Sequence, residues 1–399
     1  MQRRTETPQI ADAIDWILQH GTAHDDLGGL LAGVCERLVT AGVPLWRGSL
    51  DIPTIDPSWR AMAHKWWRDR PFSVEALPHG PEQEGIFRES VIYHVLSSGR
   101  TTCRWRIENG EGVAQFGLLR SLREEGGTDY LLKLVPFGQS RTRVTGVALS
   151  LATKRTGGFS DEDVEALEGL VPALGLAAYR ISLALTASES LSVYLGASTA
   201  RRVLAGEIRR GEGETIAAAI LFADLKGFTA FSERQEALRV VGWLNEHFEA
   251  IGLAVAAHGG EILKFMGDGL LAVFPVVDVD ARPCLVCEQA LAAAVDARAA
   301  NQAVNARRAA EGEPELDVDL ALHFGEVVYG NVGASRRLDF TVIGRAVNET
   351  CRMERLCDEI GRNIVLSQAF ARRCASPTAE VGTFALRGIE GARTVYALA

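Results

Sequence analysis

Two aspartates stand where apolar strands are expected to end, and their chemistry is that of metal ligands. Asp224 follows the apolar run 216–222, and Asp268 lies inside a Gly-Asp-Gly that separates two apolar segments. This second pattern is typical of a hairpin, so Asp268 is expected at its tip. Because a buried carboxylate is costly unless it meets a cation, the pair predicts a site for a hard divalent ion such as Mg²⁺.

A second polar set lies in segment 338–354, where a short strand is expected to end at Gly344 and a helix to follow. Asn348 and Arg352 are four residues apart, so they project from one face of that helix. Arginine offers a fork of donors to phosphate oxygens, so the pair could grip a ribose and a phosphate. A polar outer face of the helix is the alternative interpretation.

Taken in order, the segments around Asp224, Asp268 and Asn348 resemble the catalytic domain of class III nucleotide cyclases over about residues 210–399. The resemblance implies a ferredoxin-like α+β fold that works as a head-to-tail homodimer, with active sites at the interface. It also implies that Asp224, Asp268 and the carbonyl of Leu225 hold two Mg²⁺ ions per site, for which Mn²⁺ could substitute.

The resemblance also assigns the substrate-binding residues. Lys264 and Thr341 match the base-recognising positions, and Asn348 and Arg352 match the transition-state positions. A lysine and a threonine hydroxyl suit the edge of adenine, whereas guanine calls for an acidic residue at position 264. We therefore expect ATP rather than GTP. Arg387 matches a basic position that contacts the triphosphate, and an exposed hairpin charge is the equal alternative.

The resemblance thus predicts an adenylate cyclase that converts ATP to 3′,5′-cyclic AMP and pyrophosphate. A guanylate cyclase and a catalytically silent regulatory protein of the same family are the alternatives. Many adenylate cyclases of the family carry Asp where this chain has Thr341. The threonine resembles a subgroup that bicarbonate often stimulates, so stimulation by bicarbonate is a hypothesis.

The N-terminal half has a different composition. Six of the seven tryptophans precede residue 110. Helices are expected at 10–19, 27–41 and 88–97, and strand-like runs at 46–52, 102–107, 130–136 and 145–152. With the long helix that follows, this α+β pattern resembles a GAF sensory domain over about residues 25–185.

The helix after the sensory region begins with Ser160, a good capping residue, and carries an apolar stripe from Val164 to Leu185. The stripe packs on its own domain or forms a parallel dimer helix, although Pro172 and Gly175 weaken a long coiled coil. The expected segments are an N-terminal helix, a GAF-like domain, a signalling helix with linker, and the cyclase domain, over 1–24, 25–158, 159–212 and 213–399.

Composition limits the class of protein and its partners. A chain of 399 residues predicts two or three domains, and a net charge of -9 disfavours nucleic acid as a partner. No apolar region follows Arg3-Arg4, and Pro172 and Arg180 interrupt the longest apolar stretch, so neither a secretory signal nor a membrane span is expected. Seven cysteines fit reduced thiols in a cytoplasmic protein, with Cys284 and Cys287 as buried helix thiols.

Overall fold

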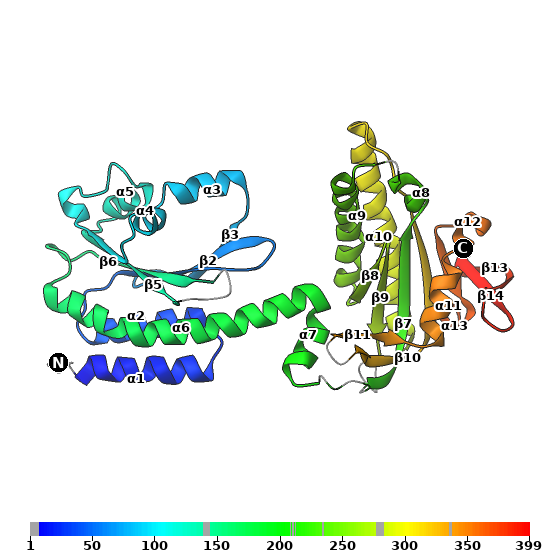
Figure 1. Cartoon of the computed structure of the whole chain (residues 1–399), viewed down its shortest axis with the longest axis horizontal. Coiled ribbons are helices and arrows are strands. Elements are labelled where there is room, and N and C mark those ends of the chain that lie inside the picture. The colour runs from blue at the N-terminus through cyan, green and yellow to red at the C-terminus, as the bar shows by residue number, and fades with distance from the viewer. Residues whose placement is uncertain are drawn as a thin grey trace. The chain divides into compact units, whose positions relative to one another are not determined.

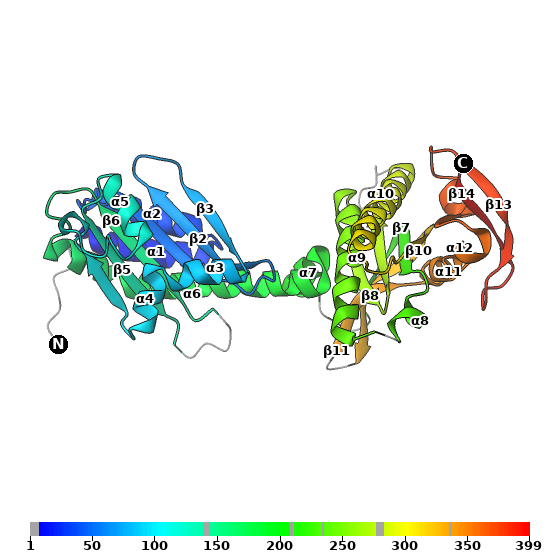
Figure 2. The same ribbon diagram turned by 90° about the horizontal axis from the view of Figure 1, so that it is seen from above.

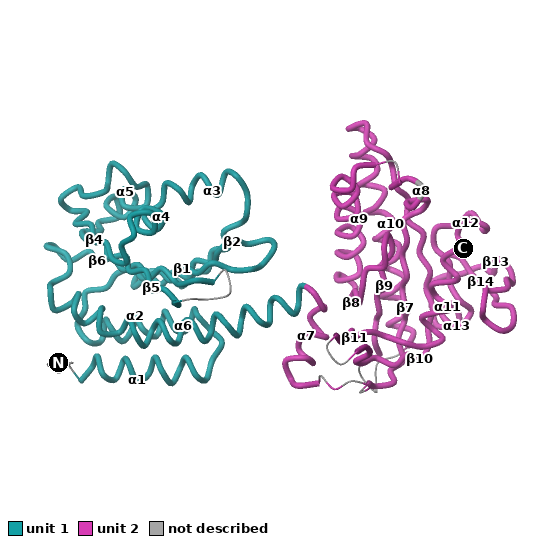
Figure 3. Tube along the Cα trace, in the orientation of Figure 1, with its two compact units in different colours: residues 1–193 teal, residues 194–399 magenta. Residues whose placement is uncertain are grey.

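The computed structural model describes residues 8–138, 144–207, 209, 211, 213–233, 235–276, 283–334 and 337–399. Residues 1–7 of the expected N-terminal segment, and residues 208, 210 and 212 of the expected linker, lie outside this part of the chain. The chain divides into two compact units, Met1–Val193 and Tyr194–Ala399 (Figure 3).

The first unit is built on a six-stranded antiparallel sheet with strand order β3-β2-β1-β6-β5-β4. Its strands are β1 (Arg47–Pro53), β2 (Trp59–Trp67), β3 (Ser73–Pro78), β4 (Thr102–Trp105), β5 (Asp129–Pro136) and β6 (Gly146–Thr153). One face is covered by α1 (Pro8–Ala23), α2 (Leu27–Thr40) and α6 (Asp161–Leu195), and the other by α3 (Pro81–Arg88), α4 (Val91–Ser97) and α5 (Gly117–Glu124) (Figure 1).

The first two helices and four of the strands were expected from the sequence and are confirmed. The helix expected over 88–97 is confirmed as α4 but begins later, because Ser90 caps it and its hydroxyl accepts the N–H of Tyr93. β2 and β3 were not predicted. The α+β class is confirmed for this unit, and the likeness to a GAF domain stays a prediction.

Helix α6 begins with a reciprocal cap and continues without a break. The N–H of Asp163 donates to Ser160 Oγ at 3.2 Å, and the N–H of Ser160 donates to Asp163 Oδ2 at 2.7 Å. Most of the apolar stripe is buried in the core of the first unit, at Leu167, Leu170, Leu174, Ala177 and Ile181. The stripe therefore packs on its own unit.

No membrane span was expected, because Pro172 and Arg180 interrupt the apolar stretch, and both residues lie within the unbroken helix α6. By length and composition alone, α6 is therefore apolar enough to cross a membrane, a property that core helices share. In the most apolar 18-residue stretch of this helix, 44% of the residues are buried inside the protein.

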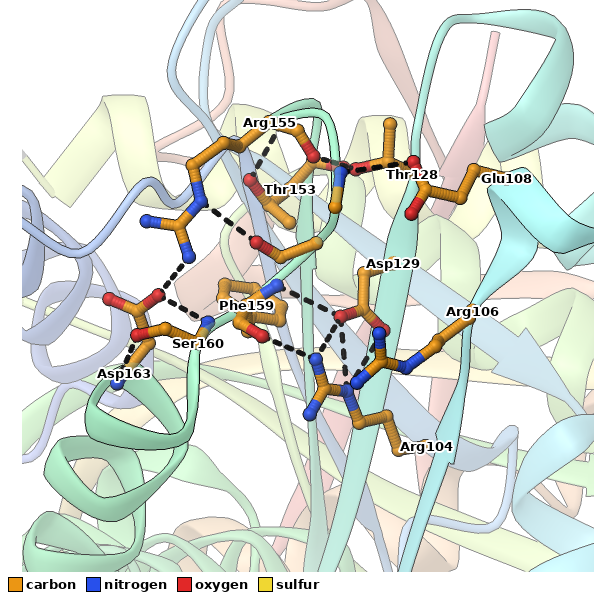
Figure 4. A network of polar contacts seen from close by, with 12 residues as sticks. Arg104, Arg106, Glu108, Thr128, Asp129, Thr153, Arg155, Phe159, Ser160 and Asp163 are labelled. Carbon is orange, nitrogen blue, oxygen red and sulfur yellow. Dashed lines mark hydrogen bonds and ion pairs between the residues drawn. The ribbon is translucent and has the colours of Figure 1, made fainter.

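A polar network that the sequence did not reveal ties the start of α6 to the sheet (Figure 4). Arg104 on β4 donates to Oδ2 of Asp129 on β5 at 2.6 Å, and the N–H of Phe159 donates to the same oxygen at 2.9 Å. Asp129 is fully buried. Arg155 forms a further ion pair with Asp163, so the first turn of the helix is held from two sides.

The second unit contains an eight-stranded sheet with the order β13-β14-β12-β10-β7-β9-β8, and β11 pairs with β10. The strands are β7 (Gly213–Leu225), β8 (Glu261–Met266), β9 (Gly269–Pro275), β10 (Val318–Ala334), β11 (Arg337–Ile343), β12 (Ile364–Ser367), β13 (Thr378–Ala385) and β14 (Ala392–Leu398). The helices are α7 (Ala197–Leu204), α8 (Phe228–Ser232), α9 (Ala237–Ala257), α10 (Pro283–Ala310), α11 (Arg345–Met353), α12 (Leu356–Ile360) and α13 (Gln368–Ala371) (Figure 2).

Strand β7 is buried on both faces of this sheet. On one face of the strand, the core that includes α9 and α10 covers Ala219, Leu221 and Ala223. On the other face, the core that includes α11 covers Ile220 and Phe222. Burial on both faces explains why the strand is a continuous apolar run, and why a carboxylate at its end stands out.

The C-x-x-C pair lies at the start of α10. Cys287 is buried, and burial raises the pKa of its thiol to about 12, but Cys284 is exposed. The expectation of two buried thiols was therefore wrong for Cys284, which belongs to the first turn of the helix, where the core does not cover it. Within the described ranges, no group of three or more His, Cys, Asp or Glu is arranged to hold a metal ion.

Candidate active site

The two aspartates predicted as metal ligands come together at one end of the sheet. Asp224 is the penultimate residue of β7 and pairs with Gly269, the first residue of β9. Asp268 lies in the tight turn between β8 and β9, where Gly267 has a φ of 69°, so the predicted hairpin is confirmed. Leu225, also predicted for this site, ends β7 and is buried.

The two carboxylates of this pair repel each other. Burial and then repulsion from Asp268 raise the pKa of Asp224 to about 6. Two carboxylates placed together at a strand end destabilise each other until a cation neutralises them, and oxygen ligands of this kind suit Mg²⁺ or Mn²⁺. The donor set therefore fits a divalent cation.

Two further acidic residues lie near Asp224, and sequence reasoning missed both. Asp319 on β10 is opposite Asp224 in the strand register and is buried. Glu354 directly follows α11, and burial, together with the charges of Asp224 and Asp319, raises its pKa to about 7. An acidic residue inside the apolar run of β10 was the available signal for Asp319. For Glu354 there was none, because only the fold brings the end of α11 to β7.

The predicted base-recognising residues lie on strands that meet. Lys264 is on β8, and its Nζ is 3.8 Å from Oδ2 of Asp339 on β11, two residues before Thr341. Thr341 is only 5% exposed, and its hydroxyl has no hydrogen-bond partner in the part of the chain that the structure describes. A buried hydroxyl without a partner costs free energy, so it is a natural contact for a bound ligand.

The predicted transition-state residues both lie on α11, and Arg387 lies close by. Asn348 is exposed, whereas Arg352 is half-buried. Lys264 and Arg352 both act on the thiol of Cys351, whose pKa is raised to about 11, chiefly by burial. The turn that contains the exposed Arg387 also reaches Arg352, because a Cβ at Gly388 would lie 3.9 Å from the Arg352 guanidinium carbon.

Within one chain, these residues form two groups, one of carboxylates and one of base- and phosphate-binding side chains. Among the described residues, no hydrogen bond or ion pair joins Asp224 or Asp268 to the second group, which comprises Lys264, Thr341, Asn348 and Arg352. The cation that acts on Asp224 is instead Arg355.

Comparison with known proteins gives a consistent result for the second unit. Residues 213–399 match the family model described as the adenylate and guanylate cyclase catalytic domain. An adenylate cyclase of Anabaena cylindrica is 34% identical over 185 residues, which are 46% of this chain and 35% of that protein. Adenylate cyclase 1 of Rhizobium meliloti is 32% identical over 178 residues, 44% of this chain and 26% of that protein.

The matched part thus spans about a third or less of the length of these curated relatives. Among solved structures, the adenylyl cyclase CyaB from P. aeruginosa matches 46% of this chain and 94% of its own. That match has 24% sequence identity and a TM-score of 0.42.

Proposed function

Because residues 213–399 match the family model of the adenylate and guanylate cyclase catalytic domain, we propose that this protein is an adenylate cyclase. It converts ATP to 3′,5′-cyclic AMP and pyrophosphate. The observation that favours ATP over GTP is the buried hydroxyl of Thr341, which has no hydrogen-bond partner among the described residues. Lys264 lies on β8, close to the strand β11 that carries Thr341. A hydroxyl and an ammonium group suit the N6 amino group and the N1 acceptor of adenine. The two relatives at 32% and 34% identity, both named adenylate cyclases, support the same choice.

In this proposal, Asp224, Asp268 and the carbonyl of Leu225 hold Mg²⁺, two ions per site, with Mn²⁺ as a substitute. When bound, the metal lowers the pKa of the ribose 3′-hydroxyl and neutralises the triphosphate. The raised pKa of Asp224 supports this role, since burial and the repulsion from Asp268 outweigh the opposing effect of Arg355.

The other residues orient and stabilise the substrate. The ribose 3′-oxygen attacks the α-phosphorus, the bond from that phosphorus to pyrophosphate breaks, and the hydroxyl proton passes to solvent. Arg352 donates to the α-phosphoryl oxygens as their charge grows, and Asn348 orients the ribose. Arg387, on the turn that reaches Arg352, contacts the triphosphate.

We further propose a homodimer in which Asp224 and Asp268 of one chain face Lys264, Thr341 and the α11 pair of the other. The separation of these residues into two unjoined groups within one chain supports this arrangement. A head-to-tail pair of chains with twofold symmetry would then complete two equal sites.

Product identification tests the proposal. Purified full-length protein is incubated with ATP or GTP and with Mg²⁺ or Mn²⁺, and the nucleotides are separated by chromatography. We expect cyclic AMP and a higher kcat/KM for ATP than for GTP. A preference for GTP would indicate the guanylate alternative, and no product from either nucleotide would indicate the catalytically silent one.

A variant sharpens this test. Lys264→Glu replaces the expected donor to adenine with an acceptor, so it should lower kcat/KM for ATP far more than for GTP. An equal loss with both nucleotides would contradict the proposed role of Lys264 in reading the base.

Regulation is part of the same proposal. The first unit would pass a signal to the cyclase domain, and bicarbonate would stimulate the enzyme directly. Rates measured with increasing bicarbonate at fixed pH and ionic strength test the second point. A rate that does not change with bicarbonate concentration would contradict direct stimulation.

A further inference from the structure

The short helix α7 at the start of the second unit is seated on the carboxylate of Glu261, the first residue of β8. The N–H of Ser198, in the first turn of α7, donates to Glu261 Oε1 at 3.0 Å. Gly196, which precedes the helix with a φ of 85°, leaves room for the same oxygen, because a Cβ there would lie 2.7 Å from it. A negative charge at this end of the helix also suits its dipole.

Tyr329 on β10 contacts both Glu261 and α7. Its hydroxyl donates to Glu261 Oε2 at 3.3 Å and lies 3.2 Å from Thr199 Oγ1 on α7. Thr199 is fully buried, Tyr329 is 6% exposed and Glu261 is half-buried. Buried polar groups that satisfy one another hold their elements in a single arrangement.

Arg202 extends the contact from α7 to β11. Its guanidinium lies over the rings of Tyr329 and Phe340, at 5.2 and 5.3 Å from their centres. The two rings pack edge to face at 4.7 Å. Phe340 immediately precedes Thr341, so α7 contacts the strand that carries the base-recognising hydroxyl.

The residue that α7 contacts lies on the strand of the second base-recognising residue. Glu261 and Lys264 share strand β8, and the pairing of β8 with β9 shifts register between Ile262 and Lys264. A register shift of this kind bends a strand and re-aims its side chains. The position of Lys264 therefore depends on where the start of β8 is held.

We propose that α7 is a clamp on the base-recognising half of the active site, with Glu261 and Tyr329 as positioning residues. The clamp fixes the position of β8 relative to β11, so that Lys264 and Thr341 contact the same purine base. This inference rests on the proposed function and adds residues that do not touch the nucleotide themselves.

The variant Tyr329→Phe tests the clamp, because it removes one hydroxyl and leaves the ring stack in place. We expect KM for ATP to rise roughly three- to tenfold, the effect of losing one hydrogen bond of ordinary strength. The preference for ATP over GTP should fall, while kcat and the Mg²⁺ concentration for half-maximal rate stay near wild type. Glu261→Gln combined with Tyr329→Phe should cost less than the sum of the two single changes.

Two matched controls lie elsewhere in the same unit. Tyr396→Phe removes a hydroxyl that lies 3.5 Å from Glu380, and Arg239→Gln removes an arginine that stacks on Trp243 and pairs with Glu313. Both should leave KM and nucleotide preference unchanged. If Tyr329→Phe lowers thermal stability but has wild-type KM and preference, the positioning role is overturned.

Hydrogen exchange separates failure of the clamp from failure of the proposed activity. Amides of Glu261–Met266 and Arg337–Ile343 should exchange faster in Tyr329→Phe than in Tyr396→Phe, whichever nucleotide the protein uses and even if it makes no product. Unchanged exchange in both strands would overturn the clamp. A protein that makes cyclic GMP should show the rise in KM with GTP instead.

Discussion

The carboxylate of Asp224 fills the space where a side chain at position 269 would lie. A Cβ on Gly269 would be 2.6 Å from Asp224 Oδ1 and 3.0 Å from the carbonyl oxygen of Ala223. The two residues are partners across β7 and β9, so neither can move aside without disturbing the sheet. The glycine after Asp268 thus serves the neighbouring strand as well as the turn.

Gly269→Ala should therefore displace the Asp224 carboxylate and weaken metal binding. We expect at least about a tenfold loss of cyclase rate and a higher Mg²⁺ requirement, as small misplacements of reacting groups cost this much or more. Gly242→Ala on α9 is the control, since a Cβ there meets nothing within 4 Å. A wild-type Mg²⁺ dependence in Gly269→Ala would show that the carboxylate tolerates the shift.

Thr341→Val should separate substrate binding from folding. The buried hydroxyl has no partner among the described residues, so an isosteric methyl should leave thermal stability unchanged or raise it slightly. KM for ATP should rise, because the contact with adenine is lost. Thr383→Val, on an exposed part of β13, is the control for both the thermal stability and the KM for ATP. A clear loss of stability with unchanged KM would assign Thr341 a structural role.

Glu354 should make the stability of the metal-free protein depend on pH. Its pKa is raised from its ordinary value to about 7, so the folded state holds a proton that the unfolded state releases. This contribution is fully present below about pH 4.5 and is lost as pH rises through 7. Glu354→Gln should therefore be the more stable protein at pH 8 and show a shallower decline between pH 5 and 8.

Thermal unfolding in EDTA across this pH range measures the effect. Glu359→Gln, an exposed substitution on α12, should follow the wild-type curve. Parallel curves for wild type and Glu354→Gln would contradict the raised pKa of Glu354.

The buried Arg104–Asp129 pair should contribute far more to the free energy of unfolding than an exposed ion pair does. Arg104→Met leaves the fully buried Asp129 without its cation, which costs about 3–5 kcal/mol. Arg88→Gln breaks a pair whose side chains are 63% and 60% exposed, and it should cost less than about 0.5 kcal/mol. Denaturant unfolding of the first unit, followed by its tryptophans, compares the two. Equal effects would refute the structural role of the network.

Mixed dimers test the proposed shared active site. Asp224→Ala and Arg352→Ala chains should each be inactive alone, and an equal mixture should recover about a quarter of wild-type activity, since half the dimers then carry one intact site. No recovery, after exchange of subunits is verified, would place both groups of residues in one chain.

The sequence by itself was enough to predict the local features of the second unit. The hairpin around Asp268, the end of β7 at Asp224 and the helix that carries Asn348 and Arg352 were all expected. Each depends on near neighbours in the chain: glycines that permit a turn, an apolar run that must be buried, and a four-residue spacing on a helix.

Tertiary structure decided what those residues meet, because strand pairing and helix packing join segments far apart in sequence. Asp319 comes beside Asp224 only through the pairing of β10 with β7, and Tyr329 reaches Glu261 and α7 only through the same sheet. Burial, which raises the pKa of Asp224 and leaves Thr341 without a partner, is likewise a property of the packed molecule. The sequence determined which groups could do chemistry, and the fold determined their charge, their partners and their separation into two groups.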